Sequence, residues 1–208
     1  RELSMLIDHL IYAHPDLDNA VDEIERRFGV RAAGGGQHRG QGTHNKLIAL
    51  GPRTYLELIA ADPAQPEPAH PRPYGTEGIT RGGLVGWAVA NDDIDAAVAE
   101  ARHHGFDPGD VIDGRRVDPT GSTLRWRLTS NALTAGPIPF LISWGDTPHP
   151  ARSAPPSLVL ESFHIEHPDP SSIEPMLAAL GAVVDVRAAS GAALVARING
   201  PGGTEELR

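Results

Sequence analysis

One short pattern, a buried strand followed directly by an amphipathic helix, occurs three times along this chain of 208 residues. The three copies begin near Leu6, Gly83 and Leu158. The second copy follows the first by 77 residues, which is the step from Asp16 to Asp93. A repeated supersecondary unit constrains the whole fold, because each copy has the same apolar faces to bury. We therefore expect a protein built from related modules.

The first copy predicts the element order β-α-β-β-β. Asp16 supplies a helix N-cap and Gly29 supplies a stop. Between them, apolar residues fall at helical spacing and charged residues occupy the other side. The expected elements are a strand at 7–13, a helix at 17–28, a weakly marked strand around 36–38, and a hairpin with strands at 45–50 and 54–59.

Two proline-rich connectors, 62–73 and 148–156, divide the chain. The resulting modules are 6–61, 83–145 and 157–208. The second module repeats the β-α-β-β-β order. The third is predicted to be a shorter β-α-β-β unit, with its helix at 173–180 and a polar, glycine-rich tail at its end.

Composition argues against several classes of function. A formal net charge of -9 with a single lysine argues against nucleic-acid binding, because phosphate recognition needs clustered Lys and Arg. There is no cysteine, so any metal must be held by His, Asp or Glu. No run approaches the roughly 18 apolar residues of a membrane span, and the start lacks an apolar signal core. We therefore expect a cytoplasmic protein with neither nucleic-acid nor membrane partners.

Six segments follow one another in an order that resembles a known superfamily. They are Ile7-Asp-His-Leu-Ile-Tyr, Gly42-Thr-His-Asn45, Tyr55-Leu-Glu-Leu-Ile-Ala60, Gly83-Leu-Val-Gly-Trp87, Leu124-Arg-Trp-Arg-Leu128 and Pro139-Phe-Leu-Ile-Ser-Trp144. Together with the paired modules, they resemble the vicinal oxygen chelate superfamily of glyoxalases, extradiol dioxygenases and bleomycin-resistance proteins. Within it, they look like the glyoxalase-like domain group. The likeness covers residues 6–145.

The resemblance implies an α+β fold in which the paired modules form a curved mixed sheet around a shared cleft. It also implies metal ligands from the first and last strands of each module. His9 and Glu57 fill the two ligand positions of the first module. Gly86 and Ile142 occupy the equivalent positions of the second module, so half of the family's metal shell is missing.

Strand alternation gives an independent view of which side chains face the cleft. His9 and Glu57 each lie on the strand face opposite to the leucine-rich one, and Tyr55 shares the face of Glu57. If the leucine-rich faces lie under the helices, His9 and Glu57 both point into the concave side and could meet. Asn45, at the start of its strand, could also reach the cleft.

Arginines and aromatic residues are the candidate ligand contacts. The predicted substrate-binding set is Asn45, Tyr55, Arg125, Arg127, Phe140 and Trp144. Guanidinium groups bind carboxylates and stack on rings, so arginines beside aromatic side chains suit an anionic or planar ligand. The alternative for the two arginines is a solvated strand face or an ion pair with one of the 27 acidic residues.

A metal site would need a third donor beside His9 and Glu57. One imidazole and one carboxylate suit a single divalent ion of Zn, Fe, Mn, Ni or Co. Four histidines could supply the missing donor: His38 or His44 in the first module, or His164 or His167 in the third. The alternative is a metal-free pair in which His9 hydrogen-bonds Glu57. Such a pair could still act as general acid and base.

Other polar features carry weaker interpretations. The glycine-rich stretch 34–42 lacks the Gly-Lys-Ser/Thr ending of a phosphate loop, and we interpret it as a mobile lip over the cleft. The remaining histidines at strand ends, in linkers or at a helix end are assigned surface roles: His14, His70, His103, His104 and His149.

These observations leave three functional hypotheses. The first is an enzyme of the vicinal oxygen chelate type, a lyase, isomerase or dioxygenase, in which Glu57 and His9 act on a small anionic or carbonyl substrate. The second is a binding or sequestration protein, like the drug-resistance members of the superfamily. The third is an inert interaction module, and strand-edge pairing would also allow a homodimer.

Overall fold

The larger of two sheets contains both predicted modules. A computed structural model describes residues 7–118 and 120–208, so Leu6, assigned above to the first module, lies outside the described residues. The strands are β1 (Ile7–Ala13), β2 (Ala33–His38), β3 (Thr43–Gly51), β4 (Thr54–Ala61), β5 (Gly83–Ala90), β6 (Val111–Val117), β7 (Thr123–Thr129) and β8 (Phe140–Ser143). They follow the order β2-β3-β4-β1-β5-β8-β7-β6. Each module therefore forms one half of a mixed sheet.

The two halves meet at β1 and β5, which are antiparallel, whereas β1–β4 and β5–β8 are parallel pairs. Leu10 pairs with Trp87 across this junction. These two residues are also equivalent in the repeat, and a residue faces its own equivalent only at a two-fold axis. The modules are therefore related by an approximate two-fold axis through this pair. The same relation makes Gly86 the equivalent of His9.

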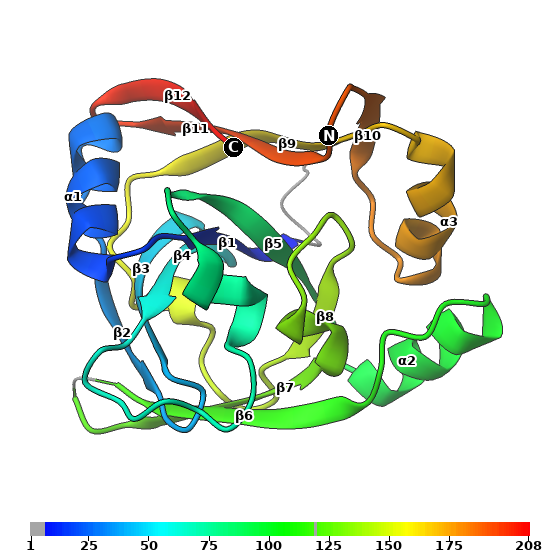
Figure 1. Ribbon diagram of the computed structural model, residues 1–208, viewed down its shortest axis with the longest axis horizontal. Coiled ribbons are helices and arrows are strands. Elements are labelled where there is room, and N and C mark those ends of the chain that lie inside the picture. Colours follow the sequence, from blue (N-terminus) through cyan, green and yellow to red (C-terminus); the bar gives the residue numbers. More distant parts are fainter. Residues whose placement is uncertain (1–6, 119) are drawn as a thin grey trace.

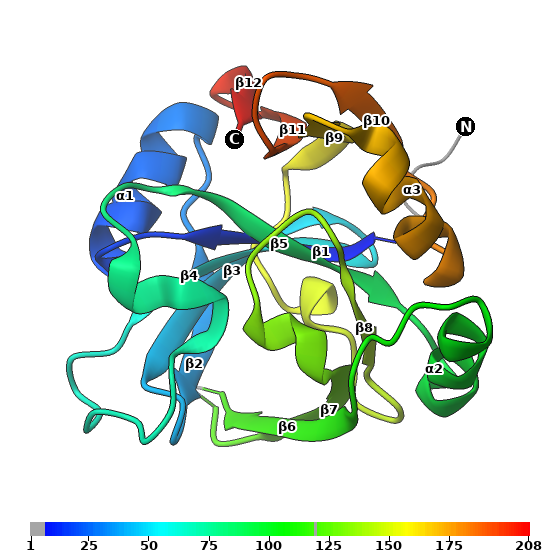
Figure 2. The ribbon, with the colours of Figure 1, turned by 45° about the vertical axis from the view of Figure 1, so that its right-hand side comes forward.

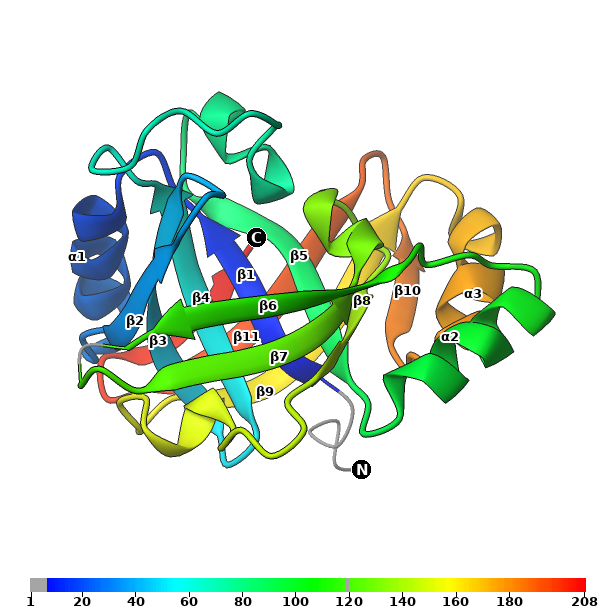
Figure 3. The same ribbon diagram turned by 90° about the horizontal axis from the view of Figure 1, so that it is seen from below.

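The sheet curls until its outer strands β2 and β6 lie side by side (Figure 3). Arg116 of β6 donates from Nη1 to the carbonyl of Gly35 in β2, at 2.7 Å. At Gly36, an added Cβ would lie 2.8 Å from the carbonyl oxygen of Val117. The interpretation of the glycine-rich stretch as a mobile lip is therefore wrong for β2. Its glycines form an edge strand that another backbone approaches closely.

Two helices cover the outer face of the sheet. Helix α1 (Leu17–Phe28) packs on β3 and β4, and α2 (Ile94–His103) packs on β7 and β8. As predicted, Asp16 caps α1 by accepting a hydrogen bond from the Asn19 N–H at 2.8 Å, and Gly29 ends it with a φ of 76°. With both helices outside, the concave side of the sheet remains available for a cleft.

The third module forms a separate small sheet. Its elements are β9 (Val159–His167), α3 (Pro170–Ala179), β10 (Asp185–Ala188), β11 (Ala193–Gly200) and β12 (Gly203–Leu207), with strand order β10-β9-β11-β12. Helix α3 begins at Pro170, earlier than predicted. The predicted polar tail is wrong, because the turn after Gly200 folds the chain back and β12 pairs with β11. This unit is therefore also β-α-β-β-β.

The small sheet covers the outer side of the central strands, away from β6 and β7 (Figures 1 and 2). Trp87 of β5 packs against Phe163 of β9, with ring centroids 5.1 Å apart. Both rings belong to one large apolar core, which also includes Leu10 and the buried face of α1. In the described residues, no helix is long and apolar enough to cross a membrane.

A cleft on the concave side of the sheet

A cleft lies on the concave side of the curled sheet. Both modules line it, and much of its wall is aromatic: Tyr55, Tyr74, Trp126, Phe140 and Trp144. A smaller number of polar side chains also reach it, as is typical of small-molecule sites. The cleft therefore has the wall chemistry of a pocket for a small, partly apolar ligand.

Glu57 of β4 is a buried carboxylate that lines this cleft. Its side chain is buried, and Asn45 of β3 donates from Nδ2 to its Oε1 at 2.6 Å. The Asn45 amide is itself fixed, because its Oδ1 accepts a hydrogen bond from the Gly36 N–H at 3.0 Å. Glu57 Oε2 lies 3.7 Å from His9 Nε2, which is too long for a hydrogen bond. One carboxylate oxygen is therefore held and the other is available to a ligand.

A β-bulge at Asp8 places a second carboxylate beside His9. Ile7 pairs with Val89 and His9 pairs with Ala88 of β5, which leaves Asp8 as the extra residue. A bulge breaks simple alternation, and here Asp8 Oδ1 reaches His9 Nδ1 at 2.7 Å. Because a carboxylate can only accept, Nδ1 carries the hydrogen and Nε2 faces Glu57. Tyr55 stacks on the His9 ring, with centroids 4.6 Å apart.

Asp8 is completely buried and receives two further hydrogen bonds. Trp144 Nε1 and His149 Nε2 each lie 3.1 Å from its Oδ2. Burial raises the pKa of Asp8, but the hydrogen bonds and charges of His149 and His9 outweigh this effect and lower it to about 2. Asp8 therefore stays ionised near neutral pH and holds the His9 ring in place.

Two residues at this site come from segments that carried no sequence signal: Tyr74 lines the cleft, and His149 lies behind it. His149, assigned above to the surface, is instead a largely buried partner of Asp8, so that interpretation is wrong. It lies in the second proline-rich connector, just before a short 3-10 turn (Pro150–Arg152). Tyr74 follows the first connector, has a left-handed backbone with a φ of 58°, and directs a buried ring toward Phe140. Neither segment has the periodicity that would place a side chain.

The structure places most of the predicted site residues on the cleft. His9, Asn45, Tyr55, Glu57, Phe140 and Trp144 all line it. Arg125 and Arg127 do not, so their prediction as ligand contacts in the same cleft as Glu57 is wrong; both border an outer hollow instead. Because the concave face buries the apolar alternates Trp126 and Leu128, both arginines point outward. Arg127 there pairs with Asp95 of α2, at 2.7 and 3.0 Å.

The arginine that does reach the cleft is Arg116 of β6, which the sequence reasoning missed. Alternation along β6 puts Ile112, Gly114 and Arg116 on one face, and all three line the cleft. Gly114 makes room for an aromatic ring, because an added Cβ would lie 2.1 Å from Trp126 Nε1. The alternation of β6 could therefore have identified Arg116 as a cleft residue. The pairing of Gly114 with Trp126 across β6 and β7 marks the same face.

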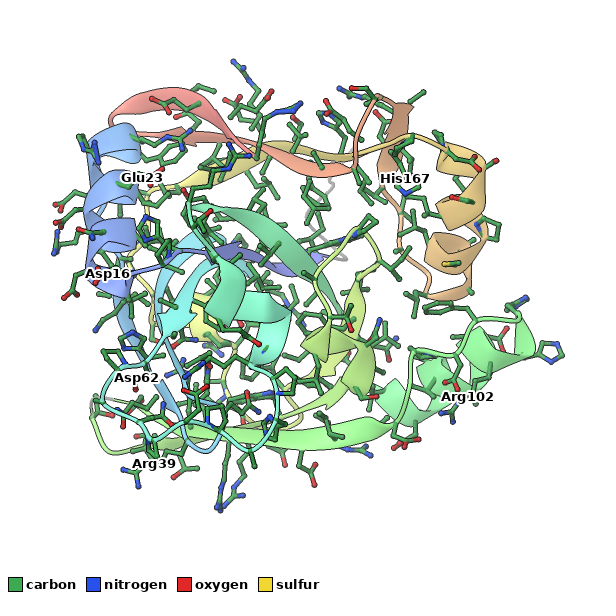
Figure 4. All side chains as sticks on the ribbon, in the orientation of Figure 1. Asp16, Glu23, Arg39, Asp62, Arg102 and His167 are labelled. Atoms are coloured by element: carbon green, nitrogen blue, oxygen red, sulfur yellow. The ribbon has the colours of Figure 1, made fainter. Side chains whose placement is uncertain are left out.

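The four candidates for the third metal ligand lie in different places. His38 lines the cleft, with Nε2 3.9 Å from Glu57 Oε1. His44 instead lies 3.8 Å from Asp62, which is labelled in the loop at the lower left of Figure 4. His164 and His167 belong to β9 of the small sheet, where His164 lies 3.7 Å from Glu166 and His167 contacts the carbonyl of Asp169. The predictions for His44, His164 and His167 as ligands beside Glu57 are therefore wrong.

The donor set does not fit the metal shell that the resemblance implies. Asn45 donates to one oxygen of Glu57, and Gly86 and Ile142 offer no donor atoms, whereas the Asp8–His9 hydrogen bond leaves His9 Nε2 available. Among residues 7–118 and 120–208, no group of three His, Cys, Asp or Glu side chains is arranged to hold a metal ion. His9 and Glu57 alone form an incomplete site.

Comparisons with known proteins agree with this architecture. Residues 7–181 match the model of a family described as "Glyoxalase-like domain". A crystal structure of a hypothetical protein from Staphylococcus aureus is similar over 97% of this chain and 98% of that chain, with a TM-score of 0.65 and 15% identity. That likeness shows the fold, including the third module.

Two epimerase structures show weaker likenesses. A methylmalonyl-CoA epimerase from Streptomyces coelicolor, in complex with 2-nitronate-propionyl-CoA, has a TM-score of 0.45 and 21% identity over 67% of this chain and 96% of that chain. The methylmalonyl-CoA epimerase from Mycobacterium tuberculosis has a TM-score of 0.43 and 19% identity over 70% of this chain and 91% of that chain. No curated protein matches the chain.

Proposed function

The chain belongs to the glyoxalase-like domain family, and we propose that it is a small-molecule enzyme of the vicinal oxygen chelate type that removes a proton next to a carbonyl group. One observation carries this proposal. Glu57 is a buried carboxylate in an aromatic cleft, with Oε1 fixed by Asn45 and Oε2 left open. A positioned carboxylate of this kind is suited to act as a general base.

His9 complements Glu57 in the proposed reaction. Its Nε2 lies 3.7 Å from Glu57 Oε2, so a substrate can contact both atoms at once. Glu57 would take the proton from carbon, and His9 would exchange a proton with the oxygen of the resulting enolate. Ionised Asp8 accepts the hydrogen bond from His9 Nδ1 and fixes the orientation of the imidazole ring. This arrangement suits an isomerase or a lyase.

No step of this reaction is assigned to a metal, because the donor set is incomplete. A divalent ion held by His9 and Glu57 is the alternative that the resemblance suggests. Elemental analysis of protein purified without chelator separates the two. About one transition metal per chain, lost together with activity on chelation, would replace the metal-free proposal.

Hydrogen exchange tests the proposed base directly. The protein is incubated in D₂O with a panel of 2-oxo acids, β-keto acids and α-substituted thioesters, and loss of the proton next to the carbonyl is followed by NMR. We expect exchange with at least one compound and its loss in Glu57→Gln. Glu100→Gln is the matched control, because that side chain is 66% exposed on α2. Equal exchange by Glu57→Gln and the wild type would refute the proposal.

A binding or sequestration protein is the second candidate. The aromatic wall favours it, because stacked rings can hold a flat ligand without any chemistry. Native mass spectrometry of the purified protein would separate the candidates. Recovery of one unchanged ligand, with no exchange on any compound of the panel, would favour binding alone. A homodimer stays a prediction, and light scattering of the purified chain would test it.

A further inference from the structure

Arg116 is a buried cation without an ion pair in the part of the chain that the structure describes. The residue is 6% exposed, and its one side-chain hydrogen bond is the donation from Nη1 to the Gly35 carbonyl. Among the described residues, no carboxylate oxygen lies within the 4.0 Å limit for an ion pair with its guanidinium. The side chain lines the same cleft as Glu57 and His9. Most of its five N–H donors therefore remain available to a ligand.

A charge in this position needs compensation. Removing a guanidinium from water is costly unless the group is paired, and neutral carbonyl groups such as that of Gly35 compensate only in part. The other arginines of the second module do not show this pattern. Arg127 has a bidentate partner in Asp95, and Arg115 is exposed on the opposite face of β6. Arg116 alone combines burial, an open cleft and unsatisfied donors.

The cleft limits which anion can reach Arg116. Guanidinium groups bind carboxylates and phosphates through paired hydrogen bonds. The carboxylate of Glu57 also lines the cleft, and it disfavours a doubly charged phosphate beside a single arginine. The rings of Trp126 and Trp144 lie 5.5 Å apart between centroids and offer flat apolar surfaces. The best match is a small, flat molecule with one carboxylate.

We propose that Arg116 binds the carboxylate of a small, flat monocarboxylic acid and so directs the carbonyl end of that molecule toward Glu57. His38 lines the same cleft as both groups, with Nε2 3.9 Å from Glu57 Oε1. Burial lowers the pKa of His38, the charge of Glu57 opposes this shift, and the charge of Arg116 adds to it. This inference rests on the proposed function, because it takes the acid to be the substrate on which Glu57 acts.

Calorimetric titration with a matched pair of probes tests the inference. Cinnamate and cinnamamide have nearly the same shape and differ in charge. Because a hydrogen-bonded charge pair adds to binding, we expect the wild-type protein to bind the acid about 10- to 100-fold more tightly than the amide. Equal binding of acid and amide, or no binding of either, would overturn the inference.

Variants assign the preference to one side chain. Arg116→Gln should remove the preference for the acid while leaving binding of the amide unchanged. Arg115→Gln is the matched control, because it removes the same charge from the outer face of the same strand and should keep the preference. Because Arg116 also joins β6 to β2, circular dichroism must show that Arg116→Gln is folded. If Arg116→Gln is unfolded, Arg116→Lys is used instead. It keeps the positive charge but lacks the paired N–H donors of a guanidinium, and it should lose most of the preference for the acid. A full preference in a folded Arg116 variant would overturn the inference.

The two proposals fail in different ways. If Glu57→Gln keeps full exchange activity while the acid preference depends on Arg116, the proposed base is wrong and the carboxylate site stands. If exchange depends on Glu57 while acid and amide bind equally, the carboxylate site is wrong and the base stands.

Discussion

A single methyl group at Gly35 should disturb both the fold and the site. Gly35 has a φ of 74°, and an added Cβ would lie 2.0 Å from the carbonyl oxygen of Asn45 and 2.7 Å from its Oδ1. Gly34, its neighbour, has a φ of 65° with no atom within 4 Å of the same position. The two glycines therefore share a left-handed backbone and differ in one contact.

The expected loss of stability follows from these two effects. A left-handed backbone costs an alanine about 1–2 kcal/mol, and this cost applies to both Gly34→Ala and Gly35→Ala. Relieving the overlap with Asn45 should cost about 1–3 kcal/mol more, because a backbone atom must move. Gly35→Ala should thus be destabilised by about 2–5 kcal/mol in total.

Urea unfolding of the wild type and the two variants measures this difference. Under native conditions, Gly35→Ala should also show slower hydrogen exchange on the substrate panel, since displacing Asn45 releases the oxygen of Glu57 that it holds. Gly34→Ala should retain the wild-type exchange rate. Equal destabilisation by both substitutions would refute the reasoning, because the close approach of β2 to Asn45 would then contribute nothing.

Three further predictions follow from individual contacts. The pKa of Asp8 falls from 3.8 to about 2 on folding, so its ionised form stabilises the protein above pH 4 and this stabilisation is lost as the pH falls toward 2. In chelator-treated protein, the stability difference between wild type and Asp8→Asn should shrink by about 2 kcal/mol between pH 5 and pH 2, measured by urea unfolding; parallel curves would contradict this. Arg127→Ala should change the midpoint of thermal unfolding little and leave ligand binding unchanged, because the Arg127–Asp95 pair is exposed; weaker ligand binding would show that Arg127 contributes to the site. Treatment with EDTA should leave the exchange rate unchanged, whereas loss of exchange that returns with added metal would restore the metal-dependent alternative.

The repeat predicted the paired modules because burial imposes strong periodic patterns. Helix α1 and its caps follow from apolar spacing and from Asp16 and Gly29. The same logic placed His9 and Glu57 on the concave side, since the alternate faces of their strands are leucine-rich. Where one face of an element is clearly apolar, the sequence alone locates the other face.

The prediction failed where long-range contacts decide the structure. Asp8 reaches His9 through a bulge, which alternation cannot anticipate. His149 and Tyr74 come from connectors whose paths depend on the finished fold. For β7, the sequence allowed either face of the strand to line the cleft. The closure of the sheet turns Trp126 toward the cleft and the flanking arginines away from it. The polar β12 forms because β11 offers it an edge.

The most direct test of the proposed function is the rate at which deuterium replaces the proton next to the carbonyl. The measurement uses the compound that the wild-type protein exchanges fastest and compares wild type with folded Glu57→Gln. The proposed base predicts a rate at least about 100-fold lower in the variant, the low end of general-base contributions. An unchanged rate would contradict it and move the chemistry away from Glu57.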